Sequence, residues 1–172
     1  AESASYQRAL IDVLVEVNLA AIPDAAGGSK PEIATLLVEV IGDKKRPLAA
    51  RAHAAHGLGR APLPAGGAGI DSAKLSKNLL ALSEQIVTDF NSSITDPGKT
   101  ASSSGVYCFY MQDAYAGTYW LKNTLPNDKN LQTTYGAMLP VAKYMMQQLQ
   151  ANNPAVVPPK LLEGLKQAAK GL

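Results

Sequence analysis

Prolines and glycines divide this chain into segments that carry apolar residues at helical spacing. One such segment places Leu75, Leu79, Leu82, Ile86 and Phe90 three or four residues apart, so that they share one face of a helix. No stretch alternates apolar and polar residues for long enough to predict a sheet strand. The pattern therefore predicts an all-α fold of about seven helices.

The breaks between these segments set the expected helix bounds. We expect helices over residues 6–21, 31–41, 47–59, 71–96, 102–123, 128–149 and 158–169. Asp71 is the expected N-cap of the fourth helix. Pro140 lies inside the sixth, where it cannot donate to Gly136, and it predicts a bend between these two residues.

A loop is expected between the third and fourth helices, where residues 62–69 read Pro-Leu-Pro-Ala-Gly-Gly-Ala-Gly. This stretch has too little side chain to pack and too much Gly and Pro to be regular. The chain thus divides into N-terminal helices at 1–61, a Gly/Pro loop at 62–70 and a C-terminal helical bundle at 71–172. We expect these parts to pack as one domain.

The charge balance narrows the classes of partner. Lys and Arg number 16 against 14 Asp and Glu, and a net charge of +2 is too small to predict a nucleic-acid interface. No apolar run approaches the ~18 residues of a membrane span. Asp12 and Glu16 interrupt the longest candidate.

The chain begins Ala1-Glu2-Ser3-Ala4, a small polar start typical of a protein from which signal peptidase has removed a leader. We therefore expect an exported protein of the periplasm or cell envelope; a chain boundary unrelated to processing is the alternative. The single Cys108 fits either compartment. We interpret it as a small buried apolar residue, with a reactive thiol as the alternative.

Residues 31–59 carry a recognisable pattern, two short helices joined by the turn Gly-Asp-Lys-Lys-Arg-Pro. The turn holds an aspartate, a small residue precedes an arginine, an alanine follows that arginine by three residues, and Leu-Gly ends the second helix. The residues concerned are Asp43, Ala50, Arg51, Ala54, Leu58 and Gly59. Small residues let the helices approach closely, and Arg51 is expected to reach back to the turn carboxylate and the helix carbonyls.

This unit resembles a HEAT repeat of the short bacterial type, and it is similar to single HEAT-like units in exported bacterial proteins of the planctomycete type. No second copy with the same spacing is found in the sequence. A single repeat cannot bury its own faces, so the flanking helices are expected to cover them. The resemblance implies a short, α-solenoid-like scaffold that presents a surface to partners.

His53 and His56, the two histidines of the chain, are three residues apart and share one face of the predicted third helix. Zinc requires three or four ligands, and no Cys or acidic residue lies within a turn of this pair. We therefore expect no metal site and no cofactor, and we interpret the pair as ordinary histidines on a basic, partly exposed helix. A pH-sensitive contact is the alternative.

Basic residues are concentrated around the turn of the HEAT-like unit. After Asp43, no acidic residue occurs before Asp71. The basic residues in between are Lys44, Lys45, Arg46, Arg51 and Arg60. Such a cluster is typical of a solvated turn, with contact to an anionic partner as the alternative.

Aromatic residues gather between residues 107 and 120. One helical stripe there is expected to pack mostly in the core, and it contains Asp113. Its other members are Val106, Tyr110, Gly117, Trp120 and Leu121. If buried, Asp113 needs a hydrogen-bond partner, for which a tyrosine hydroxyl is the expected group.

The sequence favours a non-catalytic function, because it has no Gly-x-Ser-x-Gly motif and its titratable groups are dispersed. We expect a protein-protein interaction or scaffold subunit of a cell-envelope assembly. Its predicted partner contacts are Tyr107, Tyr115, Tyr119, Lys44, Lys45 and Arg46. The alternative is a helical binding protein for a small apolar ligand or cofactor, with a pocket lined by Tyr110, Asp113, Trp120, Tyr135 and Met138.

Overall fold

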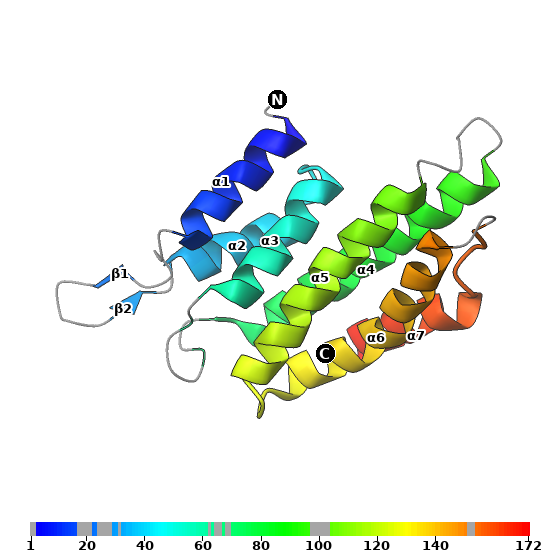
Figure 1. The fold of residues 1–172 in the computed structure, drawn as a ribbon. Helices are drawn as coiled ribbons and strands as arrows, with labels where there is room; N and C mark the ends of the chain where they lie inside the picture. The colour runs from blue at the N-terminus through cyan, green and yellow to red at the C-terminus, as the bar shows by residue number, and fades with distance from the viewer. Residues whose placement is uncertain are drawn as a thin grey trace.

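The structure of the chain is a computed structural model that describes most of its residues (Figure 1). The described ranges are 3–16, 22–23, 29–30, 32–61, 63, 67, 70–96, 104–150 and 154–172. Within these ranges no helix combines the length and the apolar character that a membrane crossing requires. Ala1 and Glu2, on which the expectation of export rests in part, lie outside the described residues, and so do residues 17–21 of the first predicted helix.

The described part of the chain is all-α, as the periodicity predicts, and contains seven helices. They are α1 (Ala4–Glu16), α2 (Glu32–Gly42), α3 (Leu48–Arg60), α4 (Ser72–Thr95), α5 (Ser104–Thr124), α6 (Lys129–Leu149) and α7 (Pro159–Lys170). Between α1 and α2, the two-residue strands β1 (Ile22–Pro23) and β2 (Ser29–Lys30) pair antiparallel, with Ile22 opposite Lys30. The sequence analysis did not predict this short pairing, which does not change the fold class.

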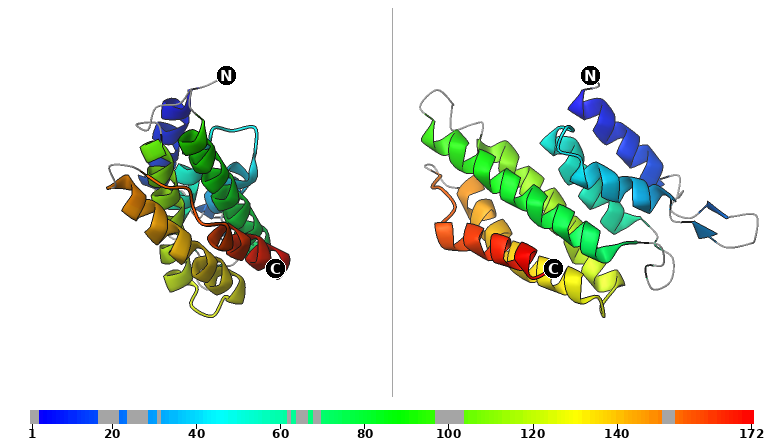
Figure 2. Two further views of the ribbon diagram at one scale, coloured as in Figure 1. Left: turned by 90° about the vertical axis from the view of Figure 1, so that its right-hand side faces the viewer. Right: turned by 180° about the vertical axis from the view of Figure 1, so that it is seen from behind.

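The helices form two layers. In the first layer α1, α3, α5 and α6 lie side by side in that order, and in the second layer α2, α4 and α7 do the same (Figure 1). The view from behind shows the second layer in front (Figure 2). In the hairpins α2–α3 and α4–α5, the first helix belongs to the second layer and the second helix to the first layer. In the hairpin α6–α7 this order is reversed.

The helices before the Gly/Pro loop pack against those after it, and the most extensive contact is between α3 and α5. Glycines allow this approach. A Cβ on Gly117 of α5 would lie 2.0 Å from the Ala55 carbonyl oxygen of α3, and a Cβ on Gly59 would lie 2.5 Å from the Gly117 carbonyl oxygen. In the loop itself, Gly67 has φ +70°, a conformation that favours glycine, and it lies against Leu125.

Helix α3 is the inner helix of the first layer, in contact with α1, α2, α4 and α5. It is rich in alanine, and Ala50, Ala52, Ala54 and Ala55 are fully buried. Alanine favours the helix and keeps it thin, so four neighbours can approach its backbone. Two of its polar residues, Arg51 and His53, are consequently buried as well.

The sequence predicts the cores of α4 and α6 well. The predicted stripe of α4 is fully buried, and the Asp71 side chain caps the helix by accepting from the Lys74 amide at 2.9 Å. On α6, Met138 and Met145 are fully buried. The helix continues through Pro140, which is exposed. The predicted bend there stays a prediction.

In the first predicted helix the apolar residues that recur at helical spacing are Leu10, Val13, Leu14, Val17 and Leu19. As a prediction of the buried face, this stripe is wrong in part. Leu10 and Val13 are 42% and 57% exposed, whereas Ile11 is buried. The reason is that α1 packs chiefly on one neighbour, α3. Ile11 and Val15 meet α3 at Gly57 and Leu14 packs partly buried against the core, whereas Leu10 and Val13 have no helix to cover them.

Candidate functional site

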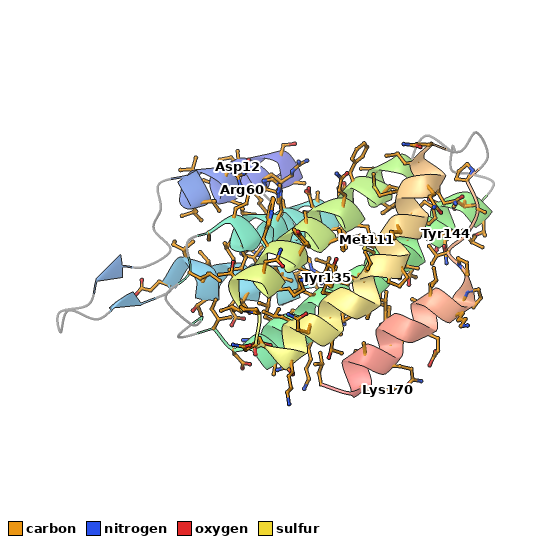
Figure 3. All side chains as sticks on the ribbon, turned by 60° about the horizontal axis from the view of Figure 1, so that its bottom comes forward. Asp12, Arg60, Met111, Tyr135, Tyr144 and Lys170 are labelled. Carbon is orange, nitrogen blue, oxygen red and sulfur yellow. The ribbon has the colours of Figure 1, made fainter. Side chains whose placement is uncertain are left out.

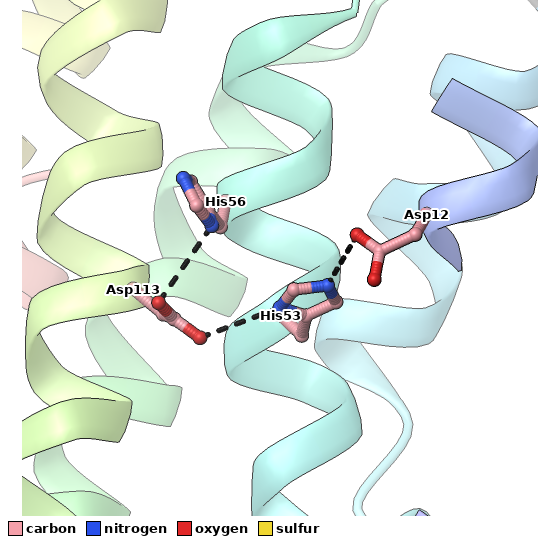
Figure 4. A network of polar contacts seen from close by, with 4 residues as sticks. All are labelled: Asp12, His53, His56 and Asp113. Atoms are coloured by element: carbon pink, nitrogen blue, oxygen red, sulfur yellow. Dashed lines mark hydrogen bonds and ion pairs between the residues drawn. The ribbon is translucent and has the colours of Figure 1, made fainter. Parts of the chain in front are cut away.

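The polar side chains of α3 meet carboxylates from two other helices (Figure 4). His53 lies between Asp12 of α1 and Asp113 of α5. Its Nε2 is 2.7 Å from the Asp12 Oδ1, and its Nδ1 is 3.4 Å from the Asp113 Oδ2. His53 therefore links the three helices α1, α3 and α5 through one imidazole ring.

His56 lies one turn further along α3 and shares Asp113 with His53. Its Nδ1 is 3.6 Å from the Asp113 Oδ1, so each histidine contacts a different oxygen of one carboxylate. The His56 ring also stacks on Trp120, with ring centroids 5.1 Å apart and 19° between the planes. The orientation of this ring is thus fixed from both sides by α5.

The surroundings shift the pKa values of the two histidines in opposite directions. The bond to Asp113 raises the pKa of His53 above its ordinary value, and Asp12 adds to this effect, against the lowering caused by burial. Burial lowers the pKa of His56, and the positive charges of His53 and Arg60 lower it further, against the influence of Asp113. The site therefore favours positive charge at His53 and a neutral ring at His56.

This arrangement corrects two interpretations from the sequence. α3 is not a partly exposed helix at His53, which is 9% exposed. The partners of Asp113 are the two histidines and not a tyrosine hydroxyl. Only residues within one turn of α3 entered the sequence argument, but the carboxylates come from α1 and α5, about 40 and 60 residues away.

Arg51 lies where the HEAT-like pattern predicts it, at the turn between α2 and α3. It is 3% exposed, and its Nε donates to the Ile41 carbonyl oxygen at 2.9 Å. The Asp43 Oδ2 pairs instead with the Arg46 Nε, 3.3 Å away. The negative charge of Asp43 acts on Arg51 without a direct bond. Arg51 thus bonds to a helix carbonyl as expected, and the HEAT-like character of the chain stays a prediction.

The basic residues of this turn do not form one surface. Lys44 and Lys45 are exposed, whereas Arg46 is half-buried and donates to the Gln7 side chain of α1 at 3.3 Å. Arg51 is buried. Of the basic partner contacts predicted from the sequence, Lys44 and Lys45 therefore remain accessible.

The predicted aromatic contacts fall into two groups. Tyr115 and Tyr119 of α5 pack with Tyr135 of α6, and the Tyr115 and Tyr135 hydroxyls are 3.1 Å apart. Burial raises the pKa of Tyr115 to about 12. Tyr107 is half-buried and meets Tyr110 edge to face.

The five residues proposed for a small-ligand pocket do not line one space. Asp113 and Trp120 contact the α3 side of α5, whereas Tyr135 belongs to α6 and packs with Tyr115 on another side of the helix. Figure 3 shows Tyr135 on α6, away from Asp12 on α1. Met138 is fully buried, with its sulfur 3.5 Å from the Thr118 hydroxyl.

The structure confirms the interpretation of Cys108 as a small buried residue. It is 1% exposed, and its thiol donates to the Met145 carbonyl oxygen at 3.2 Å. Burial raises its pKa to about 11. A thiol in this state is a poor nucleophile at neutral pH.

Comparison with known proteins gives no relative from which a role could be transferred: no family model, no curated protein and no solved structure matches the chain. The candidate residues therefore rest on geometry alone.

Proposed function

We propose that the protein is a non-catalytic interaction protein, a scaffold subunit that binds a helix of a partner protein along one face of α5. The observation that carries this proposal is the exposure of three large aromatic side chains on that face. Phe109 is 53% exposed, Tyr119 42% and Trp120 36%. We call this surface the α5 face; its other members are Gln112, Ala116 and Asn123.

The spacing of the α5 face suits a helical partner. Its members recur at positions 109, 112, 116, 119 or 120, and 123, which is the i, i+3, i+7 pattern by which one helix packs on another. The other sides of α5 are covered by α3, α4 and α6. One amphipathic helix with apolar residues at the same spacing would complete the ring of helices around α5.

A surface hollow extends the α5 face at its C-terminal end. It has a volume of about 420 Å³ and is lined by Gly59, Arg60, Trp120, Asn123 and Thr124. Interfaces derive most of their affinity from a few large side chains that enter such hollows. We assign this hollow to an anchoring side chain of the partner helix.

The placement of His53 and Cys108 supports a binding role over a catalytic one. A general base needs a ring nitrogen that can reach the substrate, but both ring nitrogens of His53 face carboxylates. The thiol of Cys108 is buried in the core. Neither group is placed to attack a substrate at the surface.

The proposal is tested by isolating partners with variants of the α5 face. The double variant Phe109→Ser/Tyr119→Ser removes two exposed aromatic rings, and Leu36→Ser is the matched control, because Leu36 is a 46% exposed apolar residue on α2. We expect wild type and Leu36→Ser to retain the same protein from cells of the source, and the double variant to retain at least about tenfold less. Circular dichroism checks that all three proteins stay helical.

Equal retention by the double variant and the control would remove the α5 face as the interface. The accessible Lys44 and Lys45 would then be the next residues to test.

A further inference from the structure

One cluster in the described part of the chain combines three groups able to bind a metal ion: His53, His56 and Asp113, whose ligand atoms all lie within 4.8 Å of one another. We propose that these three residues bind a divalent transition-metal ion, with zinc as the ion whose ligand preference they match best. Imidazole nitrogen and carboxylate oxygen are the ligands of zinc sites that keep one position open. The proposal is independent of the partner helix assigned above.

The distances already approach those of a tetrahedral site. Metal–ligand bonds of about 2.0–2.1 Å at tetrahedral angles place two ligand atoms about 3.3 Å apart. The His53 Nδ1 is 3.4 Å from the Asp113 Oδ2, and the His56 Nδ1 is 3.6 Å from the other oxygen of the same carboxylate, Oδ1. The two histidines stand one turn apart on a single helix, and the ligand atoms of all three residues lie within 4.8 Å of one another.

Asp12 provides the outer contact that metal-binding histidines usually have. A metal-bound imidazole commonly donates its second N–H to a carboxylate, which fixes the ring and raises its basicity. Asp12 lies 2.7 Å from the His53 Nε2, while the His53 Nδ1 faces Asp113 and His56. His53 is therefore oriented with one nitrogen toward the proposed ion and the other toward a carboxylate.

The charges of the site also suit a divalent cation. Asp12 and Asp113 supply two negative charges, which balance one divalent ion bound by two neutral imidazoles. Trp120 contributes by holding the His56 ring in one plane.

Access to the site is open on one side. The side chains of His56 and Asp113 are 25% and 26% exposed, whereas that of His53 is 11% exposed. An ion can enter from solvent at His56 and Asp113 and reach His53 last. The fourth position would be filled by water, since three protein ligands are present.

The test is titration of the metal-free protein with Zn²⁺. Binding is measured by calorimetry or by competition with a chromogenic chelator. We expect one ion per chain, with affinity reduced at least about 100-fold in His56→Gln and Asp113→Asn, which each lose a ligand. Asp12→Asn keeps all three ligands and should weaken binding by about 10–100-fold. Asp89→Asn is the matched control, because Asp89 lies on α4 and bonds to Gln85, and it should bind as wild type does.

A second readout separates specific binding from loss of fold. Cobalt(II) reports a tetrahedral N/O site by intense visible absorption, which should appear in wild type and Asp89→Asn but not in His56→Gln. Zn²⁺ should raise the unfolding temperature of the same two proteins and leave that of Asp113→Asn unchanged. Circular dichroism of each metal-free variant confirms that it is folded.

Two results would overturn the proposal: the absence of saturable Zn²⁺ binding by wild type, or equal affinity in wild type and His56→Gln. In either case the four side chains form a structural network that links α1, α3 and α5, and bind no ion.

Discussion

Gly117→Ala tests the close approach of α3 and α5 most directly. The substitution adds one methyl group to α5 at the point where it touches the backbone of α3. The new Cβ would lie 2.0 Å from the Ala55 carbonyl oxygen and 2.9 Å from the His56 amide nitrogen. Ordinary contacts between carbon and oxygen are about 3.3–3.6 Å, so the two helices must separate locally by more than about 1 Å.

The expected cost follows from this clash. Added methyl groups in a packed core usually cost about 1–3 kcal/mol, and the upper end applies here because the obstacle is backbone, which no rotamer change can move aside. Alanine returns about 1 kcal/mol through its better helix propensity. The net loss in the free energy of unfolding is thus about 2 kcal/mol, which lowers the unfolding temperature by about 4–8 °C for a chain of this size.

Urea unfolding followed by circular dichroism measures this loss, with Gly164→Ala as the control. Gly164 lies inside α7, and a Cβ there would meet no atom within 4 Å. The same substitution at Gly164 should therefore raise stability by about 0.5–1 kcal/mol. If Gly117→Ala is as stable as wild type or more so, the helices do not touch backbone to backbone as described.

Three further predictions concern single residues. Arg51→Ala leaves the Ile41 carbonyl oxygen without its donor and should lower the free energy of unfolding by about 1.5–3 kcal/mol in urea titrations; an unchanged midpoint would contradict the buried bond. Pro140→Ala restores an N–H to the interior of α6 and should raise stability by about 1–3 kcal/mol, so a loss of stability would contradict the cost expected of a proline inside this helix. Because the pKa of Cys108 is raised from an ordinary value of 9.0 to about 11, the folded state disfavours the thiolate, and stability should fall as pH rises from about 9 to 11. At pH 8 the thiol should react with a disulfide reagent only as fast as the protein unfolds, and rapid reaction of the native protein would show that Cys108 is accessible.

The helices themselves could be predicted from the sequence because their signals are local. Asp71 caps α4, and the stripe from Leu75 to Phe90 is buried as the spacing requires. The failure on α1 has an equally physical cause. Periodicity shows which side chains share a face, but not how many neighbours cover that face, so Leu10 and Val13 are apolar and exposed.

The candidate site could be predicted only in part, since its four side chains come from three helices. The sequence singled out His53 and His56 through their spacing, and Asp113 through its position in an apolar stripe. Nothing in the sequence indicates that Asp12 and Asp113 lie on opposite sides of His53. That depends on the glycine contact between α3 and α5, in which Gly59 was noted only for its place in the HEAT-like pattern.

Because α1 has fewer neighbouring helices than α3, the two helices should differ in their free energy of local unfolding. α3 contacts four helices, so its amide protons should exchange with solvent only when the whole domain unfolds. α1 packs chiefly on α3 and should detach by itself, at much lower free energy. Each such opening breaks the contact between Asp12 and His53. His53 should therefore be exposed to solvent far more often than the core residues around it.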